Sequence, residues 1–186
     1  MDANLFAVTC TADIEADRLN TFFTMSYENG ARMDCQPCLL LVNAWDDLKV
    51  QRELTHTIAP VDLSGVRNSF IGKPLKEIAL ELRREAAQIP SHTLSTVFAV
   101  LDERSRTEDN ALIVEFEEGE LDTARVHFDT VNAELIRIGV ITGNVGETRM
   151  LAENEPDGVL RTKALELHEQ GGPAPRKKLA ADPADR

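Results

Sequence analysis

The stretch Cys38–Ala44, CLLLVNA, places four consecutive large aliphatic residues directly behind a cysteine. An apolar run without alternation is typical of a strand that is buried on both faces, as in a parallel sheet covered by helices. A second short apolar run, LFAVTC, occupies Leu5–Cys10. We therefore expect two strands of one helix-covered sheet in the first quarter of the chain.

Helix signals follow both predicted strands. After the first strand, apolar residues recur at helical spacing, Thr11 or Asp13 is a suitable N-cap, and Asn29-Gly30 is a suitable end. After the second strand, the stretch 45–59 predicts another helix, which begins with acidic residues. The order strand–helix–strand–helix predicts a right-handed crossover and an open α/β sheet.

The stretch 74–89, PLKEIALELRREAAQI, gives the clearest helix signal in the chain. Pro74 suits a first helical turn, and Pro90 ends the pattern. The predicted apolar stripe comprises Leu75, Ile78, Leu82, Ala86 and Ile89. The predicted solvent-facing side comprises Glu77, Glu81, Arg84 and Glu85.

The second half of the chain changes to a β-type pattern. Three β-rich runs, at 96–103, 111–118 and 124–130, are separated by polar loops and predict an antiparallel meander added to the sheet. The predicted fold class is α/β with a mixed sheet, and α+β is the alternative. The length suits one domain, which we place at 1–170, and the Pro-, Ala- and charge-rich stretch 171–186 is predicted to be a disordered tail.

Three segments of the second half resemble an uncharacterised α/β domain family of bacteria and fungi. They are FAVLDERS (Phe98–Ser105), ALIVEF (Ala111–Phe116) and the stretch Ala124–Arg161, which ends in DGVLR. The family shows a comparable succession: a strand ending in Asp, a second strand, an arginine-started strand, an Asn-containing turn and a final Asp-Gly strand. The resemblance covers roughly residues 96–161 and implies an α/β fold, but no activity.

The chain carries a net charge of −12 at pH 7. Nucleic acids and anionic membrane surfaces bind positive faces, so we expect neither as a partner. The N-terminal stretch lacks the positive region of a signal peptide, and no apolar run approaches the roughly 18 residues of a membrane span. Three cysteines, an odd number, do not make a disulfide framework. We therefore expect a soluble, cytoplasmic protein.

Cys35 and Cys38 form a Cys-x-x-Cys motif, which suggests a redox pair, half of a metal site, or two thiols without a chemical role. In a thioredoxin-like site the motif opens a helix that lowers the pKa of the first thiol, whereas here it precedes a strand and Asp34 adjoins Cys35. Zinc needs two more ligands, and Cys10 would lie at the opposite end of a parallel sheet. We expect a buried, apolar Cys38, no metal and no cofactor.

The sharpest charge feature is the acidic stretch Leu101–Thr123. It holds nine acidic residues and two arginines, and so carries more than half of the net negative charge. One hypothesis is a docking face for a basic protein partner. Its candidate residues are Glu115, Glu117, Glu118 and Glu120. The alternative is a pair of solvated loops around a hairpin.

A candidate site for a small molecule follows from the predicted fold. In open α/β sheets, ligands bind outside the carboxyl ends of the parallel strands. Thr11 and Asp13 follow the first predicted strand, and Trp45 and Asp46 follow the second. These four residues are therefore the candidate ligand-binding residues, although Trp45 also suits a helix start packed on the core.

The motifs of common enzyme classes are missing from the sequence. No phosphate loop, dinucleotide fingerprint or nucleophile elbow occurs at the required spacing, so no catalytic residue is assigned. The leading hypothesis is a non-catalytic binding or accessory protein that uses an acidic surface. The alternative is a small-molecule enzyme of a biosynthetic pathway with its site at the strand ends, and a thiol redox protein using Cys35 and Cys38 is the second alternative.

Overall fold

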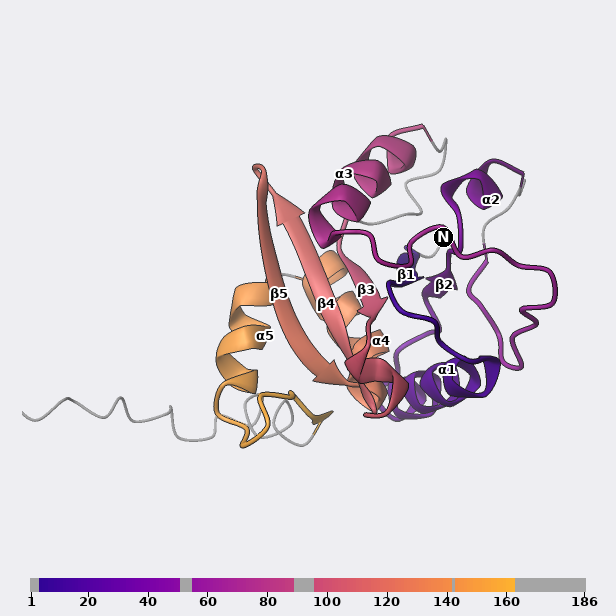
Figure 1. Ribbon diagram of the computed structural model, residues 1–186. Coiled ribbons are helices and arrows are strands. Elements are labelled where there is room, and N and C mark those ends of the chain that lie inside the picture. The colour runs from indigo at the N-terminus through magenta and orange to yellow at the C-terminus, as the bar shows by residue number, and fades with distance from the viewer. Residues whose placement is uncertain (1–3, 51–54, 89–95, 142, 163–186) are drawn as a thin grey trace, which may run out of the picture.

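The computed structural model describes residues 4–50, 55–88, 96–141 and 143–162 (Figure 1). Within these ranges five strands form one sheet. The strands are β1 (Phe6–Cys10), β2 (Leu39–Leu41), β3 (Phe98–Leu101), β4 (Asn110–Glu117) and β5 (Glu120–His127). The helices are α1 (Ala16–Arg32), α2 (Trp45–Val50), α3 (Leu75–Ala86), α4 (Phe128–Ile136) and α5 (Val145–Ala152), with a 3-10 turn at Arg104–Arg106 and a π-helical turn at Arg137–Ile141.

The sheet is mixed, in the order β2-β1-β3-β4-β5. β1 pairs in parallel with β2 and β3, whereas β4 runs antiparallel to β3, and β5 antiparallel to β4. The first strands therefore form a parallel half, and β3 to β5 form the meander. The predicted α/β class, with its N-terminal strand–helix–strand–helix unit and its meander, is confirmed.

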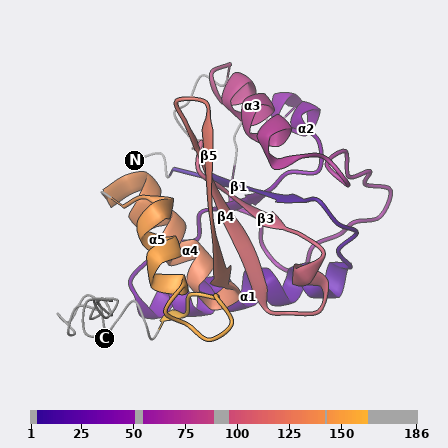
Figure 2. The same ribbon diagram turned by 60° about the vertical axis from the view of Figure 1, so that its left-hand side comes forward.

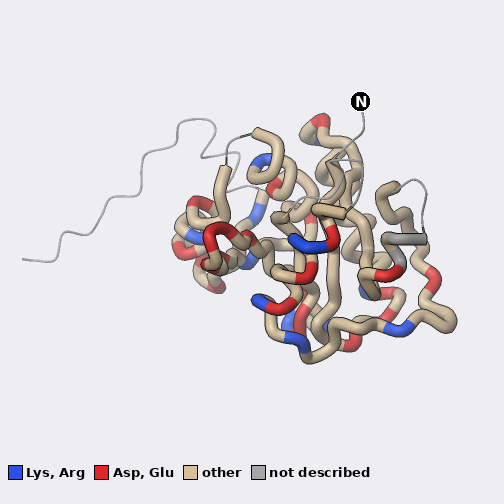
Figure 3. The backbone as a smooth tube through the Cα atoms, turned by 90° about the horizontal axis from the view of Figure 1, so that it is seen from above, with Lys and Arg blue, Asp and Glu red and all other residues tan. Residues whose placement is uncertain are grey.

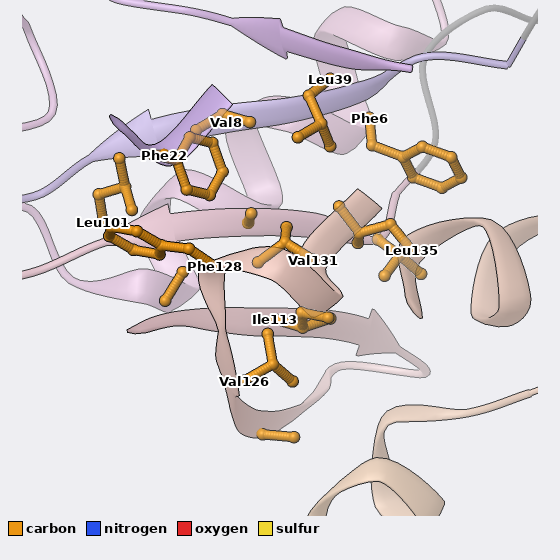
Figure 4. Close-up of a cluster of buried hydrophobic side chains, with 14 of the residues drawn as sticks. Phe6, Val8, Phe22, Leu39, Leu101, Ile113, Val126, Phe128, Val131 and Leu135 are labelled. Carbon is orange, nitrogen blue, oxygen red and sulfur yellow. The ribbon is translucent and has the colours of Figure 1, made fainter. Parts of the chain in front are cut away.

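Helices cover both faces of the sheet (Figures 1 and 2). α1, α4 and α5 lie on one face, over an apolar cluster that includes Phe22 and Phe128. α2 and α3 lie on the other face, over a cluster that includes Trp45, Phe70 and Leu82. Phe22 and Phe128 meet edge to face, with ring centroids 5.1 Å apart, and this contact packs α1 against α4 (Figure 4).

The central strand explains the apolar pattern of the N-terminal region. All five residues of β1 are buried. Phe6 and Val8 belong to the cluster beneath α1, and Ala7 belongs to the cluster beneath α3. A strand with apolar contacts on both faces shows no alternation of polar and apolar residues.

The predicted N-cap of the first helix is wrong. The chain bends at Thr11 and Ala12 and stays non-helical as far as Glu15, and the Thr11 N–H donates a hydrogen bond to the Leu101 carbonyl at 2.9 Å. α1 therefore begins only at Ala16, and its N-cap is Glu15 rather than Thr11 or Asp13. The delayed start leaves a short extended segment at the carboxyl end of β1.

The predicted end of the same helix, at Asn29-Gly30, is also wrong, since α1 continues to Arg32. Gly30 faces α4, where an added Cβ atom would lie 2.9 Å from Nδ2 of Asn132. The glycine serves the close approach of two helices. The close packing of the two helices thus accounts for a glycine at this position inside α1.

The second predicted helix is shorter than the stretch 45–59. In the described part of this stretch, only α2 is helical, and residues 55–59 are not. The Thr57 N–H donates to the Leu39 carbonyl at 2.8 Å, and the Thr57 hydroxyl accepts from the Leu41 N–H at 2.8 Å. These bonds cover the outer edge of β2, which would otherwise present unpaired backbone groups.

One residue of the third helix lies on the opposite side from the one predicted. Glu85 of α3 was expected in solvent, but it is only 5% exposed. It shares a face with Ile78 and Leu82, since positions three and seven apart coincide on a helix. The Arg84 guanidinium lies 3.0 Å from the Glu85 carboxylate and offsets its charge.

The β4–β5 hairpin closes earlier than predicted. Its turn is Glu118-Gly119, where both residues have positive φ, 52° and 92°. Such a two-residue turn matches the right-handed twist of paired strands and sets Glu117 opposite Glu120. β5 is therefore 120–127 rather than 124–130, and the last three predicted strand residues begin α4.

None of the described helices is both long and apolar enough to span a membrane. The predicted disordered tail, 171–186, lies outside the described residues.

Candidate binding site

A cavity of about 510 Å³ opens at the carboxyl ends of β1 and β3, beside the first turn of α1. Two segments of the chain line it. The first supplies Asp13, Glu15, Asp17, Arg18 and Thr21, and the second supplies Glu103, Arg106 and Thr107. This is the edge of an open α/β sheet at which ligands generally bind.

The extended segment between β1 and α1 forms the first wall. Ala12 and Ile14 are buried in the core, whereas Asp13 and Glu15 are exposed. Consecutive side chains of an extended chain point to opposite sides, so the apolar pair holds the wall against the core. The acidic pair is thereby presented to the cavity.

The 3-10 turn after β3 forms the second wall. Its central residue, Ser105, is fully buried and accepts a hydrogen bond from the Asp102 N–H at 3.0 Å. The Asp102 carboxylate also pairs with Arg125 of β5. Burial alone would raise the pKa of Asp102, but the hydrogen bond and charge of Arg125 outweigh it and hold that pKa below its usual value. The second wall is thus tied to the sheet.

Arg18 connects the two walls. Its Nε donates to the Ser105 carbonyl at 2.7 Å, and its Nη1 donates to Oδ1 of Asp109 at 2.6 Å. Nη2 is buried and lacks a hydrogen-bond partner among the described residues. The guanidinium carbon lies 4.8 Å from the ring centroid of Phe128, so a cation–π contact supplies further compensation.

Carboxylates outnumber cations in the cavity lining, by four to two. Both guanidinium groups are already engaged, Arg18 as described above and Arg106 with Glu103 at 2.6 Å. Within the described ranges, neither an ion pair nor a side-chain hydrogen bond engages the three remaining carboxylates, here called the cavity carboxylates, which are those of Asp13, Glu15 and Asp17. The cavity therefore carries negative charge that the described residues do not balance.

The N-terminus of α1 stabilises this negative charge. Glu15 is the N-cap, and Asp17 lies in the first turn. Acidic groups at a helix N-terminus interact favourably with the helix dipole, by about 0.3–1 kcal/mol each. This interaction offsets the repulsion among the cavity carboxylates.

Of the four predicted ligand-binding residues, only Asp13 lines the cavity. Thr11 lies at the end of β1 and extends its hydrogen-bonding ladder. Trp45 packs in the core on the other face of the sheet, where its Nε1 donates to Oε2 of Glu81 at 2.8 Å. Asp46 is exposed on α2 beside it. The candidate residues after β1 and those after β2 therefore do not line one cavity.

The acidic stretch Leu101–Thr123 runs from the end of β3 through the following loop and β4 to the start of β5. It reaches the hairpin tip along the eight residues of β4, which span about 26 Å. Figure 3 likewise shows acidic positions on several parts of the backbone. Glu115 accepts from the Val145 N–H at 2.9 Å and so caps α5. The other candidate partner-binding residues, Glu117, Glu118 and Glu120, are exposed around the turn.

None of the three cysteines forms a disulfide bond with another described residue. The thiol and the backbone N–H of Cys38 both donate to Oδ1 of Asn132, each at 3.1 Å. Burial raises the pKa of Cys38, and it raises the pKa of Cys10 to about 12. Both buried thiols are therefore protonated at neutral pH, whereas Cys35 is half-buried. Among the residues that the structure describes, no three His, Cys, Asp or Glu side chains are grouped to hold a metal ion.

A second polar cluster lies at the junction of β5 and α4. Nδ1 of His127 lies 2.7 Å from Oδ1 of Asp129. Burial alone would raise the pKa of Asp129, but the hydrogen bond and charge of His127 outweigh it and lower that pKa. Such a pair is suited to proton transfer, yet neither residue lines the cavity.

Several residues of the site were not found from the sequence. Arg18 is the clearest case, since its partners Ser105 and Asp109 lie 87 and 91 residues away. Neither a motif nor a local spacing connects these positions. Glu15 and Asp17 were visible as acidic residues, but they predicted only a helix start.

No family model matches the chain, and neither a curated protein nor a solved structure matches it significantly. The family resemblance of residues 96–161 therefore stays a prediction. The function is argued from the geometry of the site.

Proposed function

We propose that this chain is a binding protein whose acid-lined cavity receives a lysine or arginine side chain of a partner protein. The observation that carries this proposal is the set of three cavity carboxylates at the ligand-binding edge of the sheet, for which the described part of the chain supplies no counter-charge. A cation entering the cavity would form charge-assisted hydrogen bonds, which are stronger than neutral ones. Complementary charge also increases the rate of encounter between partners.

The composition of the lining favours a charged side chain over an apolar metabolite. Every residue that lines the cavity is polar or charged. Pockets for small molecules have comparable volumes, about 300–1,000 Å³, but are lined mainly by apolar and aromatic side chains. The cavity lacks such a lining, so it suits a hydrated, flexible cation carried by a partner.

Arg18 gives the proposed site its selectivity. It is held by Ser105, Asp109 and Phe128, so its guanidinium has a fixed position in the cavity lining. A cationic side chain would be attracted by the cavity carboxylates and repelled from the Arg18 wall. The ligand would therefore bind the cavity carboxylates rather than penetrate toward the core.

Among the described residues, the His127–Asp129 pair is the one feature that favours the alternative hypothesis of a small-molecule enzyme. A catalytic cavity requires a base or nucleophile within reach of the substrate. The cavity lining offers the hydroxyls of Thr21 and Thr107, whereas the imidazole lies at the β5–α4 junction. The redox alternative is weakened because Cys38 is buried and its thiol pKa is raised.

Fluorescence anisotropy with a labelled peptide rich in arginine and lysine tests the proposal. The cavity variant combines Asp13→Asn, Glu15→Gln and Asp17→Asn. The matched control removes the same charge at the hairpin and combines Glu117→Gln, Glu118→Gln and Glu120→Gln. We expect at least a tenfold loss of affinity at low salt in the cavity variant, about 1.4 kcal/mol, and less than a threefold loss in the control.

The two variants separate a defined site from general attraction. An equal loss in both would mean that the peptide responds only to net charge and would contradict the proposal. A loss confined to the hairpin variant would move the docking face to the β4–β5 turn. Circular dichroism of both variants confirms that each is folded before the affinities are compared.

A further inference from the structure

We infer that the chain holds a second binding site, for a neutral aromatic ligand with N–H donors, which the loop segment 65–72 occupies until such a ligand displaces it. This segment, here called the strap, lies on the carboxyl ends of β1 and β2, whereas the cavity described above lies at the ends of β1 and β3. Neither the strap nor the groups that it contacts belong to the cavity lining.

The strap is part of the long connection between α2 and α3 (Figure 1). The described part of this connection beyond α2, residues 55–74, contains neither helix nor strand. Loops of this length without secondary structure are uncommon in compact domains, and those that occur often act as lids or binding loops. The strap lies at the edge of the sheet where ligands of open α/β folds bind.

The strap donates four hydrogen bonds to backbone carbonyl groups that follow β1 and β2 or end β1. Nδ2 of Asn68 donates one at 2.8 Å, and the N–H of Gly72 donates one at 2.9 Å. The N–H and the hydroxyl of Ser69 donate two to a single carbonyl, at 2.8 and 2.9 Å. The accepting carbonyls are those of Cys10 for Asn68, Thr11 for Gly72 and Asn43 for Ser69. The strand ends thus accept N–H and O–H groups, and an anionic ligand would meet only their negative oxygens.

A single side chain anchors the strap in the core. Phe70 is fully buried, whereas Asn68 is half-buried and the other six residues of the strap are exposed. The Phe70 ring meets Trp45 edge to face, with ring centroids 4.8 Å apart. The Lys73 ammonium lies 5.9 Å from the centroid of the same ring. Another flat ring of similar size would make the same contact with Trp45.

The two ends of the strap are built to allow movement. Gly65 and Gly72 both have a φ of 74°, and no atom would lie within 4 Å of a Cβ atom added at either position. Glycine adopts many backbone conformations, and small residues at the ends of a segment often absorb the rotation of a hinge. Segments with few buried apolar contacts open at a lower free energy than core strands do. The strap can therefore lift from the sheet while β1 and β2 stay paired.

The class of ligand follows from the groups that the strap supplies. A ligand that replaces it needs a flat ring for Trp45 and an N–H donor for the carbonyls, and it needs no charge. Benzamide is a minimal probe, since it joins a phenyl ring to an NH₂ group. Methyl benzoate is the matched compound, because it has the same ring but no N–H donor. Both are neutral, so the net charge of −12 favours neither.

The fluorescence of Trp45 reports on binding, because it is the one tryptophan of the chain. The opening variant is Asn68→Ala, which loses a bond to β1 and the bond that its Oδ1 accepts from the Phe70 N–H at 2.9 Å. The matched control is Asn20→Ala, which removes an asparagine that holds the same connection outside the strap, at the Val61 N–H. We expect benzamide to give a saturable change in the parent, with affinity raised about three- to tenfold in Asn68→Ala and less than about twofold in Asn20→Ala.

Amide hydrogen exchange of the full chain separates displacement of the strap from binding beside it. Saturating benzamide should speed exchange at Ser69 and Gly72 about tenfold or more and leave Val42, whose N–H bonds to the Val8 carbonyl, unchanged. Unchanged or slower exchange at Ser69 and Gly72 would show that the strap stays closed, and would overturn the inference.

Three further results would also overturn it. Methyl benzoate that binds as tightly as benzamide would show that the carbonyls select nothing. An equal gain of affinity in both asparagine variants would reflect general loosening of the connection. The absence of a fluorescence change in the parent and in Asn68→Ala, with both shown to be folded by circular dichroism, would mean that no site opens beside Trp45.

Discussion

Nη1 of Arg18 lies 2.6 Å from Oδ1 of Asp109, and this contact joins the first turn of α1 to the loop before β4. The two residues are 91 positions apart in the sequence. Together with the bond from Nε to the Ser105 carbonyl, the contact sets the width of the cavity between its two walls. The cavity is therefore a property of the tertiary fold rather than of one loop.

Replacing Arg18 tests this cross-link. Arg18→Met keeps most of the aliphatic stem but removes the bonds to Ser105 and Asp109, so we expect a loss of about 2 kcal/mol in the free energy of unfolding. Arg104→Met is the control, because its pair with Glu108 is exposed to solvent and such pairs contribute little to stability. Denaturant unfolding measures both, and equal losses would show that Arg18 is an ordinary surface residue.

A double substitution tests the close approach of α1 and α4. In the parent, Gly30→Ala should destabilise the protein, because the new methyl group would displace Asn132 from its bonds to Cys38 and to the Gln36 carbonyl. In an Asn132→Ala background the obstacle is gone, and the same change should stabilise by up to about 1 kcal/mol through helix propensity. Thermal unfolding of the parent, the two single variants and the double variant shows whether Gly30→Ala lowers or raises the melting temperature in each background. A change in the same direction in both backgrounds would refute the packing argument.

The hairpin turn offers a stabilising change. Glu118 has a φ of 52°, a conformation that asparagine adopts more readily than glutamate. Glu118→Asn would create an Asn-Gly turn, and we expect about 0.5–1 kcal/mol of added stability. Glu120→Asn, which lies on a strand, should give no gain. A lower melting temperature for Glu118→Asn would contradict the assigned turn.

Burial of Cys10 predicts an alkaline loss of stability. Its pKa is raised from 9.0 to about 12 in the fold, so above pH 9 the unfolded chain loses this proton while the folded chain keeps it. Stability from this group is thus complete below pH 9 and falls as pH rises toward 12, by at most about 1.4 kcal/mol per pH unit. Unfolding at pH 8 to 11 should show a weaker pH dependence in Cys10→Ala. Identical slopes in both proteins would mean that Cys10 titrates in the folded state as it does in the unfolded state.

Most of the fold was predicted from the pattern of apolar residues in the sequence. The runs at Leu5–Cys10 and Cys38–Ala44 predicted buried strands, and the helical stripe at 74–89 predicted α3, because burial of apolar faces dominates these elements. Errors arose where a distant contact decided the local conformation. Gly30 packs against Asn132 instead of ending α1, and Thr57 hydrogen-bonds to the edge of β2, where a longer helix was expected.

The candidate site could be located from the sequence only as an edge of the sheet. The rule for open α/β sheets pointed to the residue pairs after the first two strands, and Asp13 does line the cavity. Trp45 does not, because β2 leads into the apolar cluster on the opposite face. The second wall of the cavity follows β3 instead. Its contact with Arg18 depends on the order of the strands in the sheet, which the spacing of apolar residues in the sequence does not reveal.

The most direct test of the cationic site is a two-dimensional ¹H–¹⁵N titration of the full chain with a peptide rich in arginine and lysine. The proposal predicts that the largest shifts fall on the amides of Asp13, Asp17, Arg18 and Thr107, and that Gly119 at the hairpin tip shifts little. Raising the salt toward 1 M, where the Debye length is about 3 Å, should reverse these shifts. Shifts centred on Gly119 with unchanged cavity amides would contradict the account.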